Sequence, residues 1–208
     1  MKTRALLAFF FFFSAALFAI TTAEIVYDSL GHPLLNGGNY SLATIPRVGG
    51  KNIIGAEVNN SNGSCSLAVV AKLFTKGWLT NIASPSSVNI TTESALWISF
   101  AQLPLNSCTN NPKWVVTSDP EFEEPVVMVG VAEALNSGCF YIKPNNSAEF
   151  FYKLDFCCEF KCGHVGVKAD SHGNNRLVVK DENEEPLVLA FVKETSDEVV
   201  ASDISMVV

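Results

Sequence analysis

The chain has 208 residues, with 14 lysines and arginines against 21 aspartates and glutamates, and a formal net charge of −7 at pH 7. An acidic surface repels phosphate groups, which argues against a nucleic-acid-binding protein because such proteins need lysine and arginine to displace counterions. The length fits a single domain that is large enough to bury a substantial core.

The first 23 residues have the composition of a secretory signal peptide. Lys2 and Arg4 precede a long apolar run without charges, and Glu24 follows that run directly. A membrane anchor is the alternative, but the far side of the run carries no basic flank. We therefore expect cleavage near Ala23, no membrane span in residues 24–208, and export to the cell exterior or to the vacuole.

Six cysteines in a chain with an export signal predict disulfide bonds rather than thiol chemistry. Three of them, Cys157, Cys158 and Cys162, lie near His164, but a single neighbouring histidine is weak support for a zinc site. We expect no metal and no cofactor.

Five sequons of the form N-x-[ST] predict N-glycosylation and surface exposure in the secretory pathway. Their number agrees with export. The asparagines are Asn39, Asn59, Asn62, Asn89 and Asn145.

Short runs of β-branched and aromatic residues, separated by Gly, Asn, Pro and Ser, fill the sequence after the leader. No stretch has a convincing helical period, so runs of this length and spacing predict an all-β sandwich or barrel. In chain order, the expected strands are 25–27, 40–45, 67–74, 96–100, 114–117, 126–131, 139–142, 150–156, 165–168, 177–180 and 187–193.

A weak internal repeat narrows the choice of architecture. An aromatic-led strand recurs at Tyr40, Trp97 and Phe140, and a second apolar run follows each copy. Three units of about four strands suit a threefold barrel, although the spacing of the copies is uneven.

The last residues, 194–208, follow the final expected strand and carry four acids and no base. An untethered chain end is one interpretation of this acidic tail. A removable sorting extension is the other.

The segment 26–42 has apolar, Asp, Gly and Tyr positions at fixed intervals, filled by Val26, Asp28, Gly31, Leu34, Tyr40 and Leu42. This pattern resembles the signature of the plant Kunitz family of protease inhibitors, which are similar to soybean trypsin inhibitor. The similarity extends over about residues 25–193. It implies a β-trefoil of about twelve strands, formed by residues 24–193 and stapled by disulfides.

The resemblance also implies disulfide pairs. Family members usually carry two bridges, and these correspond here to Cys65–Cys108 and Cys157–Cys162. The remaining pair is Cys139–Cys158. Because two of the last four cysteines are adjacent in sequence, their partners could be exchanged, and the pairing among these four stays open.

In inhibitory members of the family, a rigid exposed loop enters the protease cleft like a substrate. The resemblance places Ser87 directly before the scissile bond, where trypsin inhibitors carry Arg or Lys to match an acidic pocket floor. Ser87 supplies no cation, and a glycan on Asn89 would obstruct the cleft. Asn36 matches an asparagine that supports the loop from inside, although it could also be an ordinary turn residue. The expected reactive-loop residues are Pro85, Ser86, Ser87, Val88 and Asn89.

The resemblance implies a serine protease inhibitor homologue with altered or weak trypsin specificity, acting as a monomer in plant defence or regulation. Its partner is expected to be a serine protease of unknown identity, with a cysteine protease as a further candidate. The alternative is a non-inhibitory storage, defence or carbohydrate-binding trefoil. An enzyme is not expected, because the acids of 121–124 and 181–185 are predicted to lie in solvated hairpin loops and do not suggest a facing carboxylate pair.

Overall fold

The computed structural model describes residues 23–44, 50–59, 65–85, 88–130, 138–145, 149–158 and 161–194. Residues 1–22 of the predicted leader 1–23, the tail from residue 195 onward, Asn62, Ser86 and Ser87 lie outside these residues. The described residues form twelve strands and contain no helix that could span a membrane. The strands are β1 (Gly38–Thr44), β2 (Lys51–Asn59), β3 (Cys65–Leu73), β4 (Leu79–Ala83), β5 (Trp97–Phe100), β6 (Trp114–Thr117), β7 (Val126–Val129), β8 (Phe140–Pro144), β9 (Tyr152–Cys158), β10 (Lys161–Ala169), β11 (Asn175–Lys180) and β12 (Val188–Val192).

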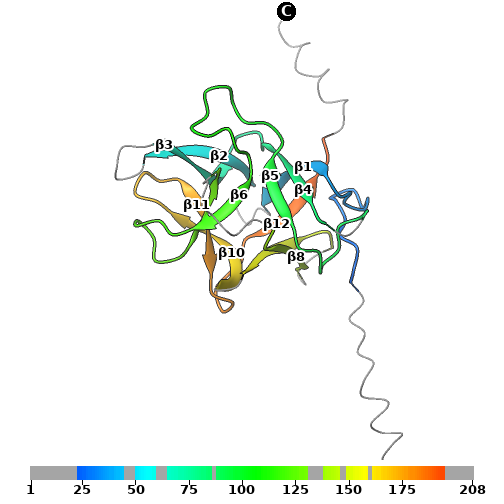
Figure 1. Cartoon of the computed structure of the whole chain (residues 1–208). Coiled ribbons are helices and arrows are strands. Elements are labelled where there is room, and N and C mark those ends of the chain that lie inside the picture. Colours follow the sequence, from blue (N-terminus) through cyan, green and yellow to red (C-terminus); the bar gives the residue numbers. More distant parts are fainter. Residues whose placement is uncertain are drawn as a thin grey trace, which may run out of the picture.

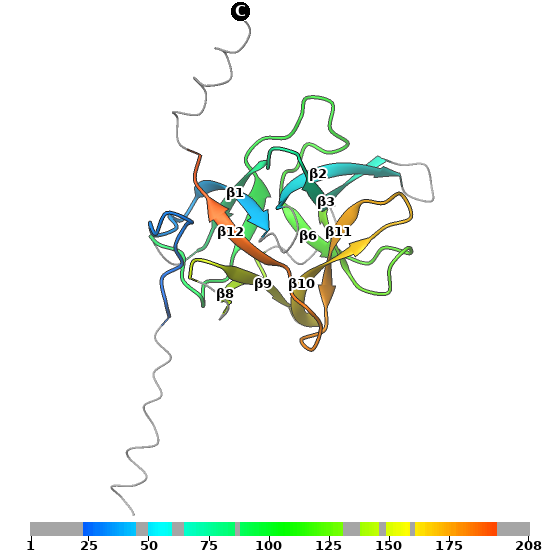
Figure 2. The same cartoon turned by 180° about the vertical axis from the view of Figure 1, so that it is seen from behind.

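Six of these strands close into a barrel (Figures 1 and 2). Antiparallel pairs join β12 to β1, β1 to β4, β4 to β5, β8 to β9 and β9 to β12. An isolated bridge between Leu96 and Phe140 joins the start of β5 to β8 and completes the ring. Closure leaves these strands without a free edge on which another chain could add.

Three hairpins, β2–β3, β6–β7 and β10–β11, pair with one another through β3, β7 and β11. The barrel and these hairpins together form a β-trefoil with the units β1–β4, β5–β8 and β9–β12. A small apolar layer joins the hairpins, separate from the main core inside the barrel. It consists of Ile54, Ala68, Val70, Val115, Val126, Met128 and Val178.

The sequence repeat was wrong about where the third unit begins. β1, β5 and β9 occupy equivalent positions, because each pairs with the last strand of the preceding unit and with the last strand of its own. Phe140 lies in β8, the last strand of the second unit, and the third unit starts at Tyr152. The last strand of one unit lies beside the first strand of the next, so both contribute large side chains to the same core.

The sequence pattern also missed β2 and β4. Gly55 interrupts the apolar run of β2, and the short β4 carries Thr80 and Asn81. Both strands form because pairing partners exist on either side. β2 pairs along its whole length with β3, and β4 pairs with β1 and β5.

Aromatic rings connect the core of one unit to the next. The ring centroids of Trp78 and Phe100 are 5.0 Å apart, and Trp114 follows at 5.4 Å from Phe100. Phe140 and Phe156 continue this series with centroid distances of 6.4 and 5.3 Å, all in edge-to-face arrangements. Such pairs each contribute about 0.5–1.5 kcal/mol beyond the burial of their area.

Three disulfides staple the trefoil: Cys65–Cys108, Cys139–Cys158 and Cys157–Cys162. These are the pairs that the family resemblance implied. The first closes 43 residues of chain and stabilises the fold by about 4 kcal/mol on the chain-entropy account. Glu57 lies within 4.8 Å of Cys65 and Cys108, but the bonded sulfurs offer no thiolate to a metal.

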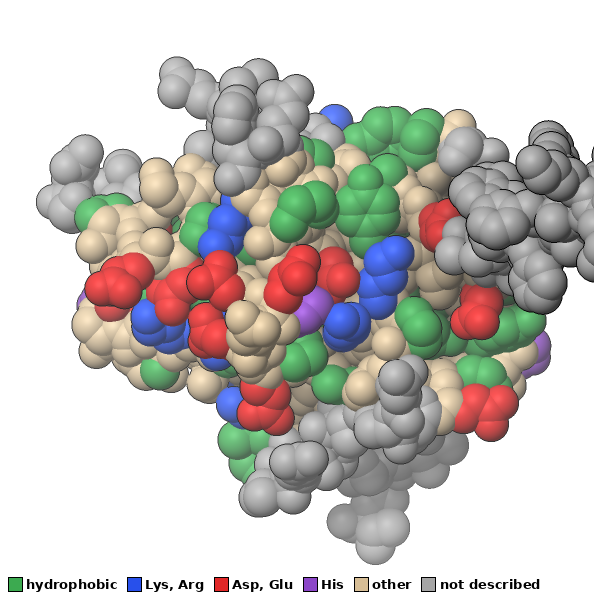
Figure 3. Space-filling model, turned by 90° about the horizontal axis from the view of Figure 1, so that it is seen from below, with side chains coloured by type: hydrophobic (Ala, Val, Ile, Leu, Met, Phe, Trp, Pro, Cys, Tyr) green, Lys and Arg blue, Asp and Glu red, His purple; other side chains and the backbone are tan. Residues whose placement is uncertain are grey.

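The acids expected in solvated hairpin loops are largely ion-paired. Glu124 contacts Lys168 at 2.7 Å, and this hydrogen bond holds the pKa of Glu124 below its usual value. Asp181 contacts Lys161 at 2.6 Å. Viewed from the side of β8 to β10, acidic and basic side chains form an interspersed band (Figure 3). The connections between strands lie over neighbouring strands that carry lysine, which the sequence alone did not reveal.

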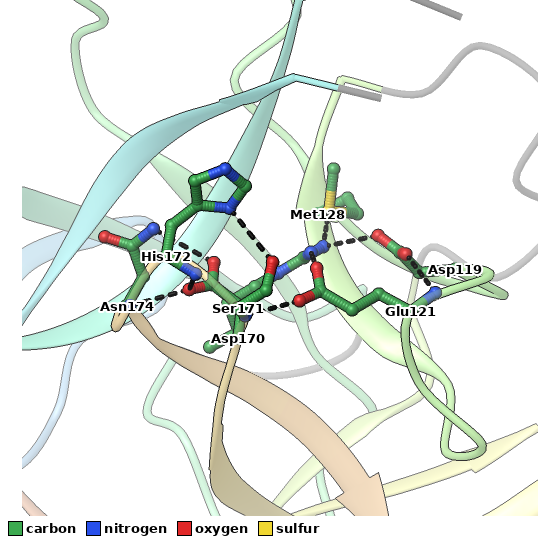
Figure 4. A network of polar contacts seen from close by, with 8 residues as sticks. Asp119, Glu121, Met128, Asp170, Ser171, His172 and Asn174 are labelled. Carbon is green, nitrogen blue, oxygen red and sulfur yellow. Dashed lines mark hydrogen bonds and ion pairs between the residues drawn. The ribbon is translucent and has the colours of Figure 1, made fainter. Parts of the chain in front are cut away.

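Arg176 joins the β6–β7 connection to the β10–β11 hairpin. Its side chain is only 2% exposed and contacts Asp119 at 2.8 Å and Glu121 at 3.8 Å (Figure 4). The guanidinium also lies 5.0 Å from the ring centre of Phe122. Loss of either carboxylate would leave a buried cation with less compensation, which is costly.

Asp170 organises the turn beside this network. Its carboxylate accepts hydrogen bonds from the backbone N–H groups of His172 and Asn174 and from the Asn174 side chain (Figure 4). Burial opposes ionisation of Asp170, but these hydrogen bonds and the charge of Arg176 hold its pKa below the usual value. The ionised carboxylate therefore stabilises the folded state above the unfolded pKa of about 3.9.

Replacement of Asp170 by Asn should lower the free energy of unfolding by about 1–2 kcal/mol at pH 7. The difference from the parent should narrow as the pH falls below about 4, because the parent then loses its carboxylate contribution through the lowered folded-state pKa. Urea unfolding at pH 7, 5, 4 and 3 measures the free energy of unfolding of the parent and of Asp170→Asn, and therefore their difference at each pH. Asp181→Asn, at a carboxylate that is 73% exposed, is the control and should change little. A difference that stays constant to pH 3 would contradict the assignment.

Gly55 leaves space for the indole of Trp78. A Cβ at position 55 would lie 2.4 Å from Cζ3 of Trp78, and Phe100 packs against the same indole. Gly55→Ala should therefore destabilise the protein by about 1–3 kcal/mol, measured by urea unfolding. At Gly50 the nearest atom would be a carbonyl oxygen at 3.5 Å, so Gly50→Ala should have a much smaller effect. Equal effects of the two substitutions would rule out the steric explanation.

Candidate reactive loop

The segment between β4 and β5 contains an exposed loop with buried ends. Ile82 and Ile90 are fully buried in the barrel core, and Ser84 is also buried. Between them Pro85 is exposed, and Val88 has 82% of its surface exposed. Anchors only eight positions apart restrict the loop and make it project from the surface.

Asn36 bridges the two sides of the loop from beneath. Its Nδ2 donates to the carbonyl oxygen of Ser84 at 2.7 Å, and its Oδ1 accepts from the Ser84 N–H at 2.8 Å. Its own backbone N–H donates to the carbonyl oxygen of Val88 at 2.9 Å. One residue thus holds the chain before and after the predicted scissile bond.

A closed ring of three backbone hydrogen bonds anchors the C-terminal side of the loop. Val26 N–H donates to Ile90 O, Ile90 N–H to Leu34 O, and Leu34 N–H to Val26 O, at 2.8–2.9 Å. All three side chains are fully buried. The chain that follows the loop is therefore fixed to two segments near the N-terminus.

The neighbouring signature residues position these segments. The hydroxyl of Tyr40, itself buried in the core, accepts a hydrogen bond from the N–H of Leu35 at 2.9 Å. Asp28 accepts hydrogen bonds from the N–H groups of Leu30 and His32, each at 2.9 Å, and so shapes the preceding turn. The sequence signature therefore supports the loop as well as the fold.

The structure brings together Asn36, Pro85, Val88 and Asn89 among the predicted site residues. Ser86 and Ser87 lie outside the described residues, so their assignment rests on the sequence. Asn89 is half-buried, and its backbone forms a bridge with Leu35. The glycosylation assignments remain predictions.

Sequence reasoning missed two supports of the loop. Ser84 is buried, and its backbone forms two hydrogen bonds with the Asn36 side chain, yet the sequence identified it only as the residue before Pro85. Lys143, from β8, donates to the carbonyl oxygen of Thr92 at 2.9 Å and so fixes the chain further along. These contacts join residues 48 and 51 positions apart, which no local pattern reveals.

The described part of the loop is exposed at Pro85 and Val88 and is held from beneath by Asn36. The sequence profile of the family described as "Trypsin and protease inhibitor", the legume Kunitz proteins, matches residues 26–193. The chain belongs to the legume Kunitz family. It is 35% identical over 184 residues to trypsin inhibitor A of Glycine max, covering 82% of each chain.

Solved Kunitz structures share the fold. Trypsin inhibitor 1 from Senna obtusifolia superposes with a TM-score of 0.72 at 37% identity, covering 84% of this chain and all of that one. The soybean inhibitor in its complex with porcine pancreatic trypsin gives a TM-score of 0.68 at 32% identity, covering 83% of this chain and all of that one. A relative of this Kunitz protein therefore binds a serine protease on the same scaffold.

Removal of the Asn36 side chain should loosen the loop without unfolding the trefoil. Asn36→Ala loses both contacts to Ser84, which should cost about 1–3 kcal/mol locally and speed subtilisin cleavage between residues 84 and 90 about tenfold or more. Timed digestion with mass-spectrometric mapping measures this rate. Asn81→Ala is the control, because its side chain donates at 2.7 Å to Gly37 O and not to the loop. Equal rates for parent and Asn36→Ala would contradict the brace.

Proposed function

We propose that the protein inhibits a serine protease by presenting residues 84–89 as a substrate-like loop. The bracing of Ser84 and Val88 by Asn36 is the observation that carries this proposal. Because Ser84 and Val88 are held in place before the protease binds, less conformational entropy is lost on association. If the protease cuts between the two braced residues, both new ends stay attached to Asn36, which favours re-formation of the bond over release.

We propose that the specificity differs from that of trypsin inhibitors. The resemblance assigns Ser87 to the position that fills the specificity pocket, and a serine leaves the acidic floor of the trypsin pocket without a cation. An unpaired buried charge costs on the order of a few kcal/mol. A small neutral side chain suits the pockets of elastase-like or subtilisin-like enzymes better.

The proposal includes export and the absence of enzymatic activity. A leader typical of secretion and three disulfides, which persist in oxidising compartments, support a secreted or vacuolar location. The family description and several similar curated proteins, among them trypsin inhibitors A and B of Glycine max, carry the names of inhibitors. Intact-mass measurement of protein from its natural source should show a chain that begins near Glu24.

Titration against trypsin, chymotrypsin, elastase, subtilisin and papain tests the function. Tight, saturable inhibition of at least one serine protease supports the proposal. Inhibition of papain alone would point to a cysteine protease as the partner. An inert titration against all five would favour a non-inhibitory storage, defence or carbohydrate-binding protein.

Ser87→Arg should convert the loop into a trypsin-binding loop. If the scaffold holds the backbone in place, one charge-assisted contact to the acid in the pocket should increase trypsin affinity about a hundredfold or more. Inhibition constants of bacterially produced protein, which lacks a glycan on Asn89, measure the gain. Ser29→Arg adds the same charge to an exposed turn and should leave trypsin inhibition unchanged. No gain in a correctly folded Ser87→Arg protein would mean that the loop geometry is not inhibitory.

A further inference from the structure

A groove of about 500 Å³ opens beside the C-terminal flank of the reactive loop. Its lining residues belong to the N-terminal segment, to the chain that follows the reactive loop, and to the described ends of the β8–β9 connection. The residues relevant here are Glu24, Tyr27, Thr92, Glu149, Phe150 and Phe151.

The aromatic wall of the groove is held in place by contacts on several sides. Phe150 has a φ of 61°, a left-handed conformation that is costly for an aromatic residue. Its ring lies 6.1 Å from the Tyr27 ring and next to Gly31, where an added Cβ would be 3.4 Å away. The backbone N–H of Tyr27 donates to the hydroxyl of Tyr152 at 2.9 Å. A non-glycine residue in this conformation at a concave surface points to a functional role.

The carboxylates of the groove lack a cationic partner among the described residues. Glu24 and Glu149 are both exposed, and neither forms an ion pair with a described lysine, arginine or histidine. The nearby Lys143 is used elsewhere, donating to Thr92 O and lying 5.7 Å from the centre of the Tyr141 ring. Cleavage before Glu24 would create an N-terminal ammonium group at the groove. With two carboxylates, the groove would still carry a net negative charge.

A groove lined by both carboxylates and aromatic residues matches the chemistry of a guanidinium or ammonium group. Such a cation gains charge-assisted hydrogen bonds from carboxylates and cation–π attraction from the rings. We propose that the groove binds an arginine or lysine side chain of the protease that docks on the reactive loop. This inference rests on the proposed inhibitory function and adds a second recognition site to it.

The position of the groove fits this partner. Residues 88–91 are extended, with bridges from Asn89 to Leu35 and from Thr91 to Ile25, and Thr92 lines the groove. At about 3.3 Å per residue, the groove begins about 13 Å from Val88. A protease that buries about 800 Å² on the inhibitor covers a patch about 30 Å across, so it would reach the groove.

The first experiment tests the groove without a protease. N-acetyl-arginine amide is titrated into a chain that begins at Glu24 and carries Ser147→Ala, which removes the sequon at Asn145 and keeps every described lining residue. Aromatic NMR signals of Tyr27, Phe150 and Phe151 should shift saturably. N-acetyl-citrulline amide, the neutral isostere, and the Glu149→Gln variant should each weaken binding about tenfold. Glu123 is an exposed glutamate of the β6–β7 connection, and Glu123→Gln should not weaken binding.

Three results of that titration would overturn the groove as a cation site. They are the absence of saturable shifts, equal binding of the citrulline compound, and a stronger response to di-N-acetylchitobiose, which would indicate a carbohydrate site.

The second experiment tests the occupant with a protease that the parent protein inhibits. Glu149→Gln should weaken inhibition about tenfold, mainly through a slower association rate at low salt, whereas Glu123→Gln should not. Unchanged inhibition by Glu149→Gln would overturn the protease as the occupant. If the parent inhibits no protease, the proposed function and this occupant both fail, and the arginine titration alone decides the chemistry of the groove.

Discussion

The ring of backbone hydrogen bonds among Val26, Leu34 and Ile90 links the reactive loop to the trefoil. Each of these residues donates to the next, and their buried side chains form part of the barrel core. Loop, N-terminal segment and barrel therefore share one set of contacts. Because the ring is buried and satisfied, opening it would expose unpaired backbone groups as well as apolar side chains, which makes it costly to disturb.

The rigid support beneath the loop and the side chain at its tip have different roles in binding a protease. Asn36 holds the backbone on both sides of the tip, so the loop can be presented without a large loss of entropy on binding. In the proposed function, the side chain at position 87 selects the protease. A family can keep such a scaffold while it changes targets, because the bracing contacts involve backbone atoms of the loop and not the specificity side chain.

The charged groups divide into those that stabilise the scaffold and those that remain available. Arg176, Lys161 and Lys168 are paired with acids of neighbouring connections and hold hairpins together. Glu24 and Glu149 line a groove with aromatic walls and have no ion-pair partner among the described residues. Four of the described lysines, Lys76, Lys161, Lys168 and Lys180, form ion pairs with acids of the chain, and Glu24 and Glu149 are not among these acids. The position of these two carboxylates favours a partner already held at the loop.

Much of the fold and part of the site could be predicted from the sequence. Short runs of β-branched and aromatic residues without a helical period indicated the all-β class, and the signature from Val26 to Leu42 identified the trefoil, because these features are local in the chain. The pairing of β4 with β1 and β5, the start of the third unit at Tyr152 and the contacts of Ser84 and Lys143 depend on residues far apart in sequence. Only the closed barrel decided them, since it brings the N-terminal segment, the loop and β8 side by side, and local propensity carries no information about such neighbours.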